Sequence, residues 1–449
     1  MAKFNLILLV LILLFIPLYP KFPLLGVSGT YVSIRLDDLV VALVFAVFAA
    51  QSLKRKFSDF FTPLSRSVLL YLFTGVVATF SAIFVIKSSD LSQGVLYTLR
   101  HFEYFTLFYC GYAFTKKTTD LHFITRVILV VSVLISFYGL GQAFFNFPVI
   151  STTNSEFSKG LALTLGPGAR INSTFAGQYD LAAYCMFPLL LIIALLPYAK
   201  PKWFLIFVGG LLYWTLLLSA SRITFFSFVA SAGLLLLVIR RRLWLIPLGF
   251  IAVIGVLMSP QLRGRYLDLI TTRLKLSSAV TVYAQSPSLP PASASAVSKN
   301  VATPAAALVP SAQPEDRSTD IRLQVEWPRA IRAFTKNPVL GTGFSSVGLA
   351  VDNDLLRSLA ETGLVGTAAF LLIFIRFFKS SWSYLIRYPA DHPTLAASFV
   401  AAFSLGLFGL IINALFIDIF TASKIAFTTW CLMGVSEKII YLSYDTGTV

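Results

Sequence analysis

The sequence predicts an all-α, polytopic membrane protein with one large loop on the outer side of the membrane. Of its 449 residues, 57% are hydrophobic and only 12% are charged, whereas soluble domains carry about twice that charged fraction. Apolar runs of the length that a membrane helix needs, roughly 20 residues, recur along the chain. Lys and Arg residues concentrate in alternate short loops, which is the pattern that orients membrane helices.

About twelve apolar segments are long enough to span a bilayer. They lie at 4–19, 38–53, 67–86, 95–115, 124–146, 179–198, 203–220, 223–239, 243–259, 355–377, 394–416 and 419–440. The fourth contains Arg100 and the last contains Lys424, which is unusual for a span. The first follows Lys3 and resembles a signal peptide, but no small-residue cleavage site follows Leu18, so we expect a retained helix.

The basic residues predict that both termini lie in the cytoplasm. With the N-terminus placed there, the cytoplasmic loops contain clustered Lys and Arg residues and the short outer loops contain only scattered ones. The clusters are Lys54-Arg55-Lys56, Lys116-Lys117, Lys200 with Lys202, Arg240-Arg241-Arg242, and Arg376 with Lys379 and Arg387. A formal charge of +16 often indicates nucleic acid. Because these loops account for the charge, we predict no nucleic-acid partner.

The chain divides into three regions: 1–259 with nine segments, an outer loop at 260–354, and 355–449 with three segments. Within the loop, residues 284–314 are mostly Ala, Ser, Pro and Val, without an aromatic residue. Such a composition cannot bury enough apolar surface to fold, which predicts a disordered insert. Apolar residues at helical spacing over 320–334 predict a broken or paired amphipathic helix against the membrane face.

The sequence predicts neither a metal site nor a cofactor. Its three Cys residues lie in or beside apolar runs, and its three His residues are scattered. The pairs Asp37-Asp38 and Asp352-x-Asp354 offer two carboxylates each, and hard cations usually need more oxygen ligands.

Arginines of the outer loops are the first candidates for a binding site. Arg222 lies in a very short turn between two apolar segments, where a charge near hydrocarbon is costly and indicates function. The others are Arg170, Arg322, Arg329 and Arg332. Arg suits bidentate binding of phosphate or carboxylate. Alternatively, these residues contact lipid head groups or solvate the loop.

A polar stripe enters the tenth segment from the outer side. Asp354, Arg357, Ser358 and Glu361 share one helical face. A purely structural interpretation is also open, in which Asp352 or Asn353 caps the helix and Arg357 pairs with Glu361. Gly363 and Gly366 would then let a neighbouring helix approach closely.

Four blocks of this sequence resemble the O-antigen ligase and O-antigen polymerase superfamily of bacterial envelope glycan enzymes, in the order of that family. They are Arg170–Tyr184, Ser219–Thr224, Arg322 with Trp327 and Asn337–Phe344, and Asp352–Gly366. About twelve spans with a large loop between the ninth and tenth are also similar to this family. Each block is degenerate, so their order carries more information than any single block.

The resemblance implies transfer of a glycan from a polyprenyl diphosphate carrier on the outer leaflet of the cytoplasmic (inner) membrane. It implies that Arg222, Arg322 and Arg170 hold the diphosphate, and that Asp352 and Asn353 are catalytic. Ligases of the family carry a His where this chain has Asp352. That departure puts ligase activity in doubt and favours a polymerase-like member.

Elementary chemistry agrees with that site. A diphosphate leaving group needs cations to neutralise it and a base to take the proton of the acceptor hydroxyl. Asp, with a pKa of about 3.9, is a weaker base than His at about 6.5. Partial desolvation would raise the pKa of Asp352, and a nearby Arg would oppose that rise.

The expected partners are the lipid-linked glycan donor, a glycan, lipid or protein acceptor, membrane lipids, and envelope glycan export or assembly proteins. Two other functions stay open. A transporter or flippase of lipid-linked glycans would need polar groups along a mid-membrane path, and the spans have few charges at their centres. A non-catalytic envelope assembly partner needs no such path.

Overall fold

The structure is a computed structural model of the chain. It describes residues 2–20, 22–26, 33–54, 60–150, 163–166, 169–260, 262–264, 266, 321–348, 350–387 and 394–445. The insert expected at 284–314 lies outside the described residues.

Helices make up nearly all of the regular structure. In chain order they are α1 (Ala2–Leu18), α2 (Leu36–Lys54), α3 (Pro63–Ser81), η2 (Ala82–Ile86), α4 (Leu91–Phe114), α5 (Asp120–Phe144), α7 (Gln178–Leu195), α8 (Lys202–Leu218), α9 (Arg222–Val238), η3 (Arg242–Trp244), α10 (Leu245–Met258), η4 (Arg322–Glu326), α13 (Trp327–Lys336), α14 (Asp354–Arg387), α15 (Leu395–Ala414) and α16 (Ser423–Asp445). The described strands form two short antiparallel pairs, β1 (Pro23–Gly26) with β2 (Ser33–Arg35) and β3 (Pro148–Val149) with β4 (Leu163–Thr164). The all-α class is confirmed.

Each of the twelve apolar segments coincides with a helix, but not every helix is long and apolar enough to cross a membrane. Seven described helices meet both criteria, and four shorter apolar helices, α1, α8, α9 and α10 with η3, have 10–17 residues. The twelfth is α4, with Arg100 and Glu103 in its sequence. The chain is a multi-pass membrane protein, and the count of twelve spans stays a prediction.

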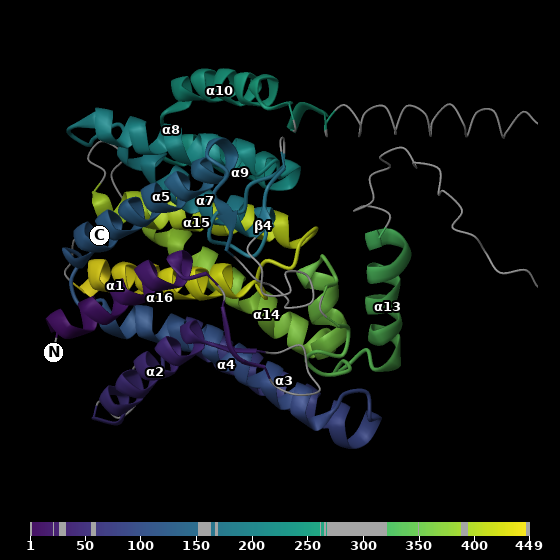
Figure 1. Cartoon of the computed structure of the whole chain (residues 1–449). Coiled ribbons are helices and arrows are strands. Elements are labelled where there is room, and N and C mark those ends of the chain that lie inside the picture. The colour runs from purple at the N-terminus through teal and green to yellow at the C-terminus, as the bar shows by residue number, and fades with distance from the viewer. Residues whose placement is uncertain are drawn as a thin grey trace, which may run out of the picture.

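The helices run alongside one another in a bundle (Figure 1). Among them, α4 packs on α16, α3 on α14, and both α7 and α9 on α15. The first residues of α1 and the last of α16 lie at one end of this bundle, and α13 runs across the opposite end (Figure 1). The basic clusters flank the helix ends on the terminal side, because α2 ends at Lys54, α9 ends before Arg240 and α14 ends at Arg387.

The amphipathic segment before the tenth span is one uninterrupted helical run with a π-helical turn, and not the broken or paired helix that the sequence predicts. A π-helical turn, η4, precedes α13, which has a proline in its first turn. Ala330 of α13 is buried in a small apolar cluster with Val347, Val351 and Ala360, whereas Ile331 on the same helix is half exposed. The segment therefore packs one face on α14 and leaves apolar side chains on the outside.

Helix α14 is interrupted at Gly363, and this corrects the expectation that its glycines admit a neighbouring helix. Gly363 has φ 65° and ψ −168°, a conformation that suits glycine. The turn at 338–343 fills the break: the amides of Thr342 and Gly343 donate to the carbonyls of Ala360 and Glu361, each at 2.9 Å. After the break, the Leu364 amide donates to the Pro338 carbonyl at 2.8 Å.

The turn gives hydrogen-bond partners to backbone groups that the interrupted helix would otherwise leave unpaired inside a membrane protein. A Cβ on Gly363 would lie 2.3 Å from the carbonyl oxygen of Val339, so the approach of the loop requires glycine there. The same turn buries Phe344, whose ring stacks on His101 with centroids 3.8 Å apart. Asn337–Phe344 is thus a plug that connects α14 to α4.

Candidate functional site

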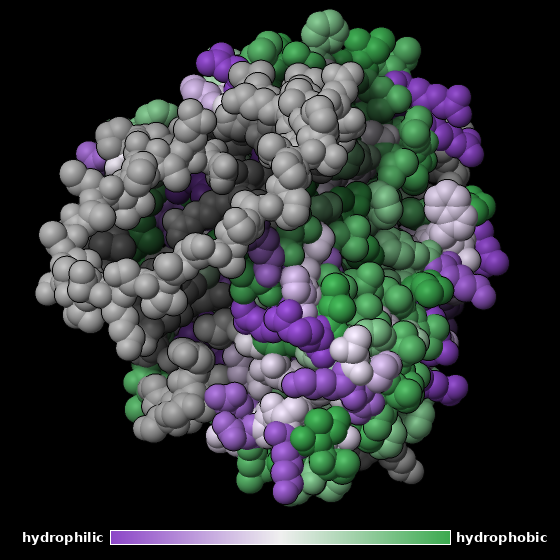
Figure 2. Space-filling view, turned by 90° about the vertical axis from the view of Figure 1, so that its right-hand side faces the viewer, coloured by the Kyte–Doolittle hydropathy of each residue, from purple (hydrophilic) through white to green (hydrophobic). Residues whose placement is uncertain are grey.

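The structure brings parts of all four sequence blocks to the α13 end of the bundle. The Ile171 amide lies 3.4 Å from the Leu218 carbonyl at the end of α8. Further along, Thr224 Oγ1 donates to Asn413 Oδ1 at 2.7 Å. Figure 2 faces this end and shows hydrophilic residues gathered on its described surface beside a hydrophobic flank.

The C-terminal end of α15 joins the second block to the fourth. Asn413 receives the hydrogen bond from Thr224, and two residues later the carbonyl of Leu415 accepts a hydrogen bond from Asn353 Nδ2 at 3.0 Å. Blocks that are distant in the sequence therefore meet on one short segment.

Asp352 and Arg322 form an ion pair at the centre of this end. Arg322 Nε and Nη2 each lie 2.9 Å from Asp352 Oδ2. The Asp352 side chain is 30% exposed and that of Arg322 is 12% exposed. Asp352 has φ 53°, in the left-handed region that Asp tolerates better than most residues. Two of the predicted site residues are thus in direct contact.

Asp418, in the loop between α15 and α16, shapes the backbone around Asp352. Its Oδ2 accepts hydrogen bonds from the amides of Val351 at 2.8 Å and Asp352 at 3.0 Å, and its Oδ1 accepts from the Asn353 amide at 3.2 Å. Arg357 Nη2 lies 2.8 Å from the same carboxylate. Four donors therefore hold one carboxylate directly beneath the Asp352 backbone.

Asp418 is not among the site residues that the sequence predicts. Its only sequence signal is an acidic residue in a short loop between two apolar segments, the same reasoning that singled out Arg222.

Asp354 holds the α15–α16 loop from the other side. Its Oδ2 accepts from the amides of Ile419 at 2.7 Å and Phe420 at 2.9 Å. Asp418 and Asp354 thus each bind backbone amides of the residues next to the other. Because Asp352 contacts Arg322 instead, Asp352 and Asp354 do not form a carboxylate pair. Among the described residues, no group of three or more His, Cys, Asp and Glu side chains converges as metal ligands would.

Asn353, and not Asp352, caps α14, which settles the two structural alternatives. Asn353 Oδ1 accepts from the Leu356 amide at 2.9 Å, the contact that an N-cap residue makes. The side chain is buried, and its Nδ2 contacts Leu415. The Asp352 carboxylate binds Arg322, so it is not the cap.

Arg357 connects the cap region to the helix break. It pairs with Glu361 at 3.2 Å, as the i, i+4 spacing predicted, and also donates to the Gly348 carbonyl at 3.1 Å. Glu361 Oε1 accepts from the Ser345 amide at 3.2 Å. Arg357 and Glu361 border a cavity of about 20 Å³, which His101 and several aromatic side chains also line, space for about one water molecule.

Arg170 and Arg222 occupy other parts of the same end. Arg170 Nη1 lies 3.5 Å from the Tyr179 hydroxyl, and its guanidinium lies 5.8 Å from that ring. Arg222 begins α9, and its carbonyl accepts from the Tyr266 hydroxyl at 3.2 Å. Of the three predicted diphosphate ligands, Arg322 is paired with Asp352.

Lys424, which is unusual in the last apolar segment, is buried at this end of the bundle. Lys424 Nζ donates to the carbonyls of Pro17 at 2.9 Å and Thr174 at 2.7 Å, and lies 4.9 Å from the Phe175 ring centroid. The first block therefore anchors α16 through its backbone. A buried charge needs such partners, which explains how a lysine is accommodated there.

A second ionic cluster explains the charges of the fourth segment. Arg100 of α4 is hydrogen-bonded to Asp38 of α2 and, at 2.9 Å, to Glu103. Arg35 lies 3.4 Å from Asp37 and 3.7 Å from Asp38. The Asp37-Asp38 carboxylates are thus partners of arginines.

The two aspartates around the ion pair have opposite electrostatic environments. Burial raises the pKa of the Asp352 carboxyl above its usual value, and the Arg322 charge opposes this rise without cancelling it. Burial also acts on Asp418, but the Arg357 charge and hydrogen bond and the backbone amides outweigh it and lower the pKa of Asp418. Asp352 is therefore the better proton acceptor of the two.

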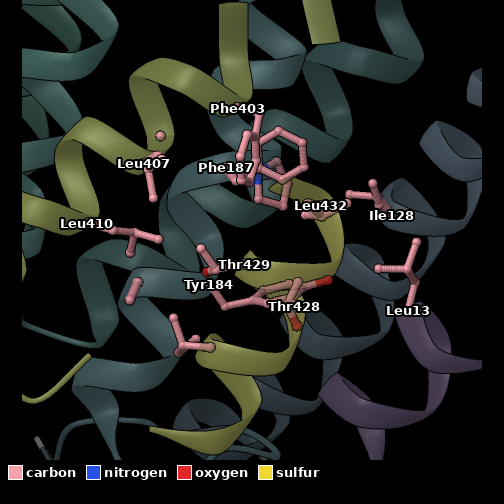
Figure 3. A pocket seen from close by; sticks show the side chains of 14 residues that line it. Leu13, Ile128, Tyr184, Phe187, Phe403, Leu407, Leu410, Thr428, Thr429 and Leu432 are labelled. Carbon is pink, nitrogen blue, oxygen red and sulfur yellow. The ribbon is translucent and has the colours of Figure 1, made fainter. Parts of the chain in front are cut away.

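The interior of the bundle contains an apolar cavity of about 30 Å³, shown in Figure 3. Leu13 of α1, Ile128 of α5, Phe187 of α7, Phe403 of α15 and Leu432 of α16 point into it (Figure 3). None of its lining residues is charged, so this cavity offers no polar path through the bundle.

No curated protein matches the chain. Residues 205–371 match a protein family described as O-antigen ligase. This region contains Arg222, Arg322, the plug at Asn337–Phe344, Asp352 and the cap residue Asn353, whereas Arg170 precedes it. Over this region the chain is similar to the O-antigen ligase family, in agreement with the helical membrane fold and the ordered blocks, and the match supports a ligase- or polymerase-like function in surface polysaccharide biosynthesis.

Proposed function

We propose that this protein is a glycosyltransferase that moves a glycan from a polyprenyl diphosphate carrier to an acceptor hydroxyl. The observation that carries the proposal is the Arg322–Asp352 pair, a partly exposed cation and carboxylate 2.9 Å apart inside the family-matched region. One group can neutralise phosphate and the other can accept a proton. Both are needed where a sugar leaves a diphosphate.

In the proposed reaction, the acceptor oxygen attacks the anomeric carbon and the bond from that carbon to the diphosphate oxygen breaks. The diphosphate departs with the bonding electrons, and the hydroxyl proton passes to the Asp352 carboxylate. The elevated pKa of Asp352 favours this acceptance. Asp418 and Asn353 act through position, because they fix the backbone that carries Asp352.

Arg322 neutralises the diphosphate in this proposal, with Arg222 and Arg170 as further ligands. A guanidinium has five N–H donors, and the Asp352 contacts use those on Nε and Nη2. Arg322 can therefore hold the base and one phosphate together. Arg222 and Arg170 lie on segments that meet at the same end of the bundle.

The proposed location is the outer face of the cytoplasmic membrane, with both termini in the cytoplasm. The support is the gathering of Lys and Arg residues at the end opposite the Asp352 site. Labelling of a cysteine introduced at Ser293 in intact cells tests this orientation. Labelling that occurs only after lysis would contradict it.

Within the superfamily we propose a polymerase-like reaction, because this chain has Asp352 where ligases carry a His. The acceptor is then a second carrier-linked glycan. Mass spectrometry of lipid-linked glycans from cells lacking the protein tests this choice. Accumulated single repeat units support a polymerase, and accumulated long chains support a ligase.

Transfer by the purified protein tests the activity itself. The protein is reconstituted with lipid-linked repeat units, and the products are measured by mass spectrometry beside the Arg322→Lys variant. We expect longer carrier-linked glycans from the unmodified chain, and about tenfold to a hundredfold slower transfer by the variant. Translocation of the lipid across vesicles without any transfer would instead indicate a flippase, and a lack of both would indicate an assembly partner.

A further inference from the structure

A larger cavity lies at the other end of the bundle, away from Asp352. Its volume is about 440 Å³, compared with about 20 Å³ beside Arg357. It lies among the last turns of α7, α9 and α14 and the first turns of α15. None of the residues proposed to act in glycan transfer lines it.

The lining combines two cations with an apolar wall. Arg240 and Arg242 contribute exposed guanidinium groups. The apolar residues are Ala194, Leu237, Val238, Ile239, Trp382, Leu385, Ile386, Ala397 and Ala401. None of the described lining residues is acidic. The site therefore suits a molecule with an anionic head and an apolar body.

The chain reversal after α9 fixes the two arginines at this cavity. Arg240 has φ 55° and ends the helical run. Next to it, Arg241 Nη2 donates to the Tyr198 hydroxyl at 3.3 Å, and its guanidinium lies 5.5 Å from the Tyr198 ring. This contact ties the turn to the end of α7. Because Arg240 and Arg242 flank Arg241 in the chain, this contact also holds them at the cavity.

The surroundings point to a lipid of the adjacent leaflet. Trp382 is 57% exposed and Ile386 is 64% exposed, and both line the cavity. In a membrane protein, such side chains at a helix end contact lipid or its interface. Basic pockets between helices at the end that carries positive charge attract anionic head groups.

We propose that this cavity binds an anionic phospholipid. Its phosphate contacts Arg240 and Arg242, and one acyl chain lies along Leu237, Leu385 and Ile386. The inference is independent of the glycan-transfer proposal, because it concerns other residues at the opposite end of the molecule.

The test measures lipid binding to the purified protein by native mass spectrometry, with phosphatidylglycerol and phosphatidylcholine as probes. The variant is Arg240→Asn with Arg242→Gln, since Asn tolerates the left-handed backbone of position 240. We expect the affinity for phosphatidylglycerol to fall on the order of thirtyfold, from the contributions of two basic residues. Affinity for phosphatidylcholine should not change.

The matched control is Lys200→Gln with Lys202→Gln, which removes the same charge at the same end but outside the lining. We expect a loss of less than about threefold there, because exposed charges act weakly across salt solution. Equal losses in both variants would show that general surface charge binds the lipid, which overturns the proposal. Equal affinity of the unmodified protein for the two lipids would overturn it too.

Two further measurements separate a lipid site from a simple anion site. Trp382→Ala keeps both arginines and should weaken phosphatidylglycerol binding through the apolar wall. Inorganic phosphate at the same concentration as the lipid should not displace the lipid. Displacement by phosphate, or full binding by the Trp382→Ala variant, would show that only an anion is recognised. Arg242→Gln alone gives the same comparison if the double variant does not fold.

Discussion

Two arginine–carboxylate pairs at the head of α14 have nearly the same geometry and different surroundings. Arg322 lies 2.9 Å from Asp352, and Arg357 lies 2.8 Å from Asp418. The Asp418 carboxylate also accepts three backbone N–H groups and is 12% exposed, whereas that of Asp352 is 30% exposed. Identical chemical groups, from two different loops, therefore serve two purposes at the head of α14.

The difference shows how the surroundings of a carboxylate decide whether it has a structural or a reactive role. Donors that stabilise a carboxylate lower its pKa, and burial without enough of them raises it. Asp418 follows the first case and Asp352 the second. A carboxylate saturated with donors holds backbone in place. One with a single partner can exchange that partner for a substrate.

The largest expected effect tests whether Asp418 has a structural role. Asp418→Ala leaves Arg357 buried without its main counter-charge, and breaking a buried pair costs about 3–5 kcal/mol. We expect a large fall in the melting temperature in detergent, together with loss of transfer. Asp352→Asn is the control and should lower the melting temperature clearly less, because the Asp352 carboxylate is more exposed than that of Asp418 and Asn tolerates the left-handed backbone. Equal destabilisation by both variants would contradict the division.

The next effect concerns Asp352 as a base. Asp352→Asn keeps the shape and removes the proton acceptor, and general base catalysis contributes about a hundredfold to ten-thousandfold. We expect a folded variant that transfers glycan at least about a hundredfold more slowly. Asp352→His should retain some activity. If the Asn variant works at the normal rate, Glu326, whose pKa is raised by burial and by Asp352, becomes the next residue to test.

Substitutions of Arg322 and Arg222 test the role of the cations. Replacement of either by Lys keeps the charge and loses the bidentate fork. Hydrogen bonds to charged groups contribute about 1.5–3 kcal/mol, so we expect transfer to fall by about tenfold to a hundredfold. Arg332→Lys, on an exposed position of α13, is the matched control. Normal turnover and donor affinity in Arg222→Ala would exclude that residue.

The pH dependence should separate the two aspartates. Because the pKa of Asp352 is raised, its active deprotonated form is lost early as the pH falls, at a pH that is still above the ordinary Asp pKa of about 3.9. The pKa of Asp418 is lowered, so its stabilisation is complete above about 3.9 and lost only as the pH falls below that value. Transfer should therefore fail while the protein is still folded. Rate profiles and circular dichroism measured together check this order.

The smallest effect is expected from the Ala-, Ser- and Pro-rich stretch at 284–314. Its composition cannot form a core, and the entropy of loop closure depends weakly on length. A short Gly-Ser linker in its place should leave expression and transfer near normal. A well-expressed replacement without activity would show that the stretch takes part in function.

The amino-acid sequence by itself determined the helical membrane class and the positions of the helices, and it singled out Arg322 and Asp352 as candidate site residues. Hydropathy and helical spacing are local properties, and the ordered blocks lie within short stretches. Which of Asp352 and Asn353 caps α14 was open, because both residue types are good caps. The hydrogen bond from the Leu356 amide to Asn353 and the contact of Asp352 with Arg322 decided it.

Tertiary structure alone decided the roles of Asp418, Lys424 and Gly363. Asp418 binds an amide 66 positions away, and Lys424 binds a carbonyl 407 positions away. Gly363 breaks its helix because the turn before Gly343 supplies the missing hydrogen bonds. Such partners depend on how helices pack, and packing joins residues that no local pattern relates. The physical reason is that a buried charge or open backbone group is stable only where distant donors and acceptors satisfy it.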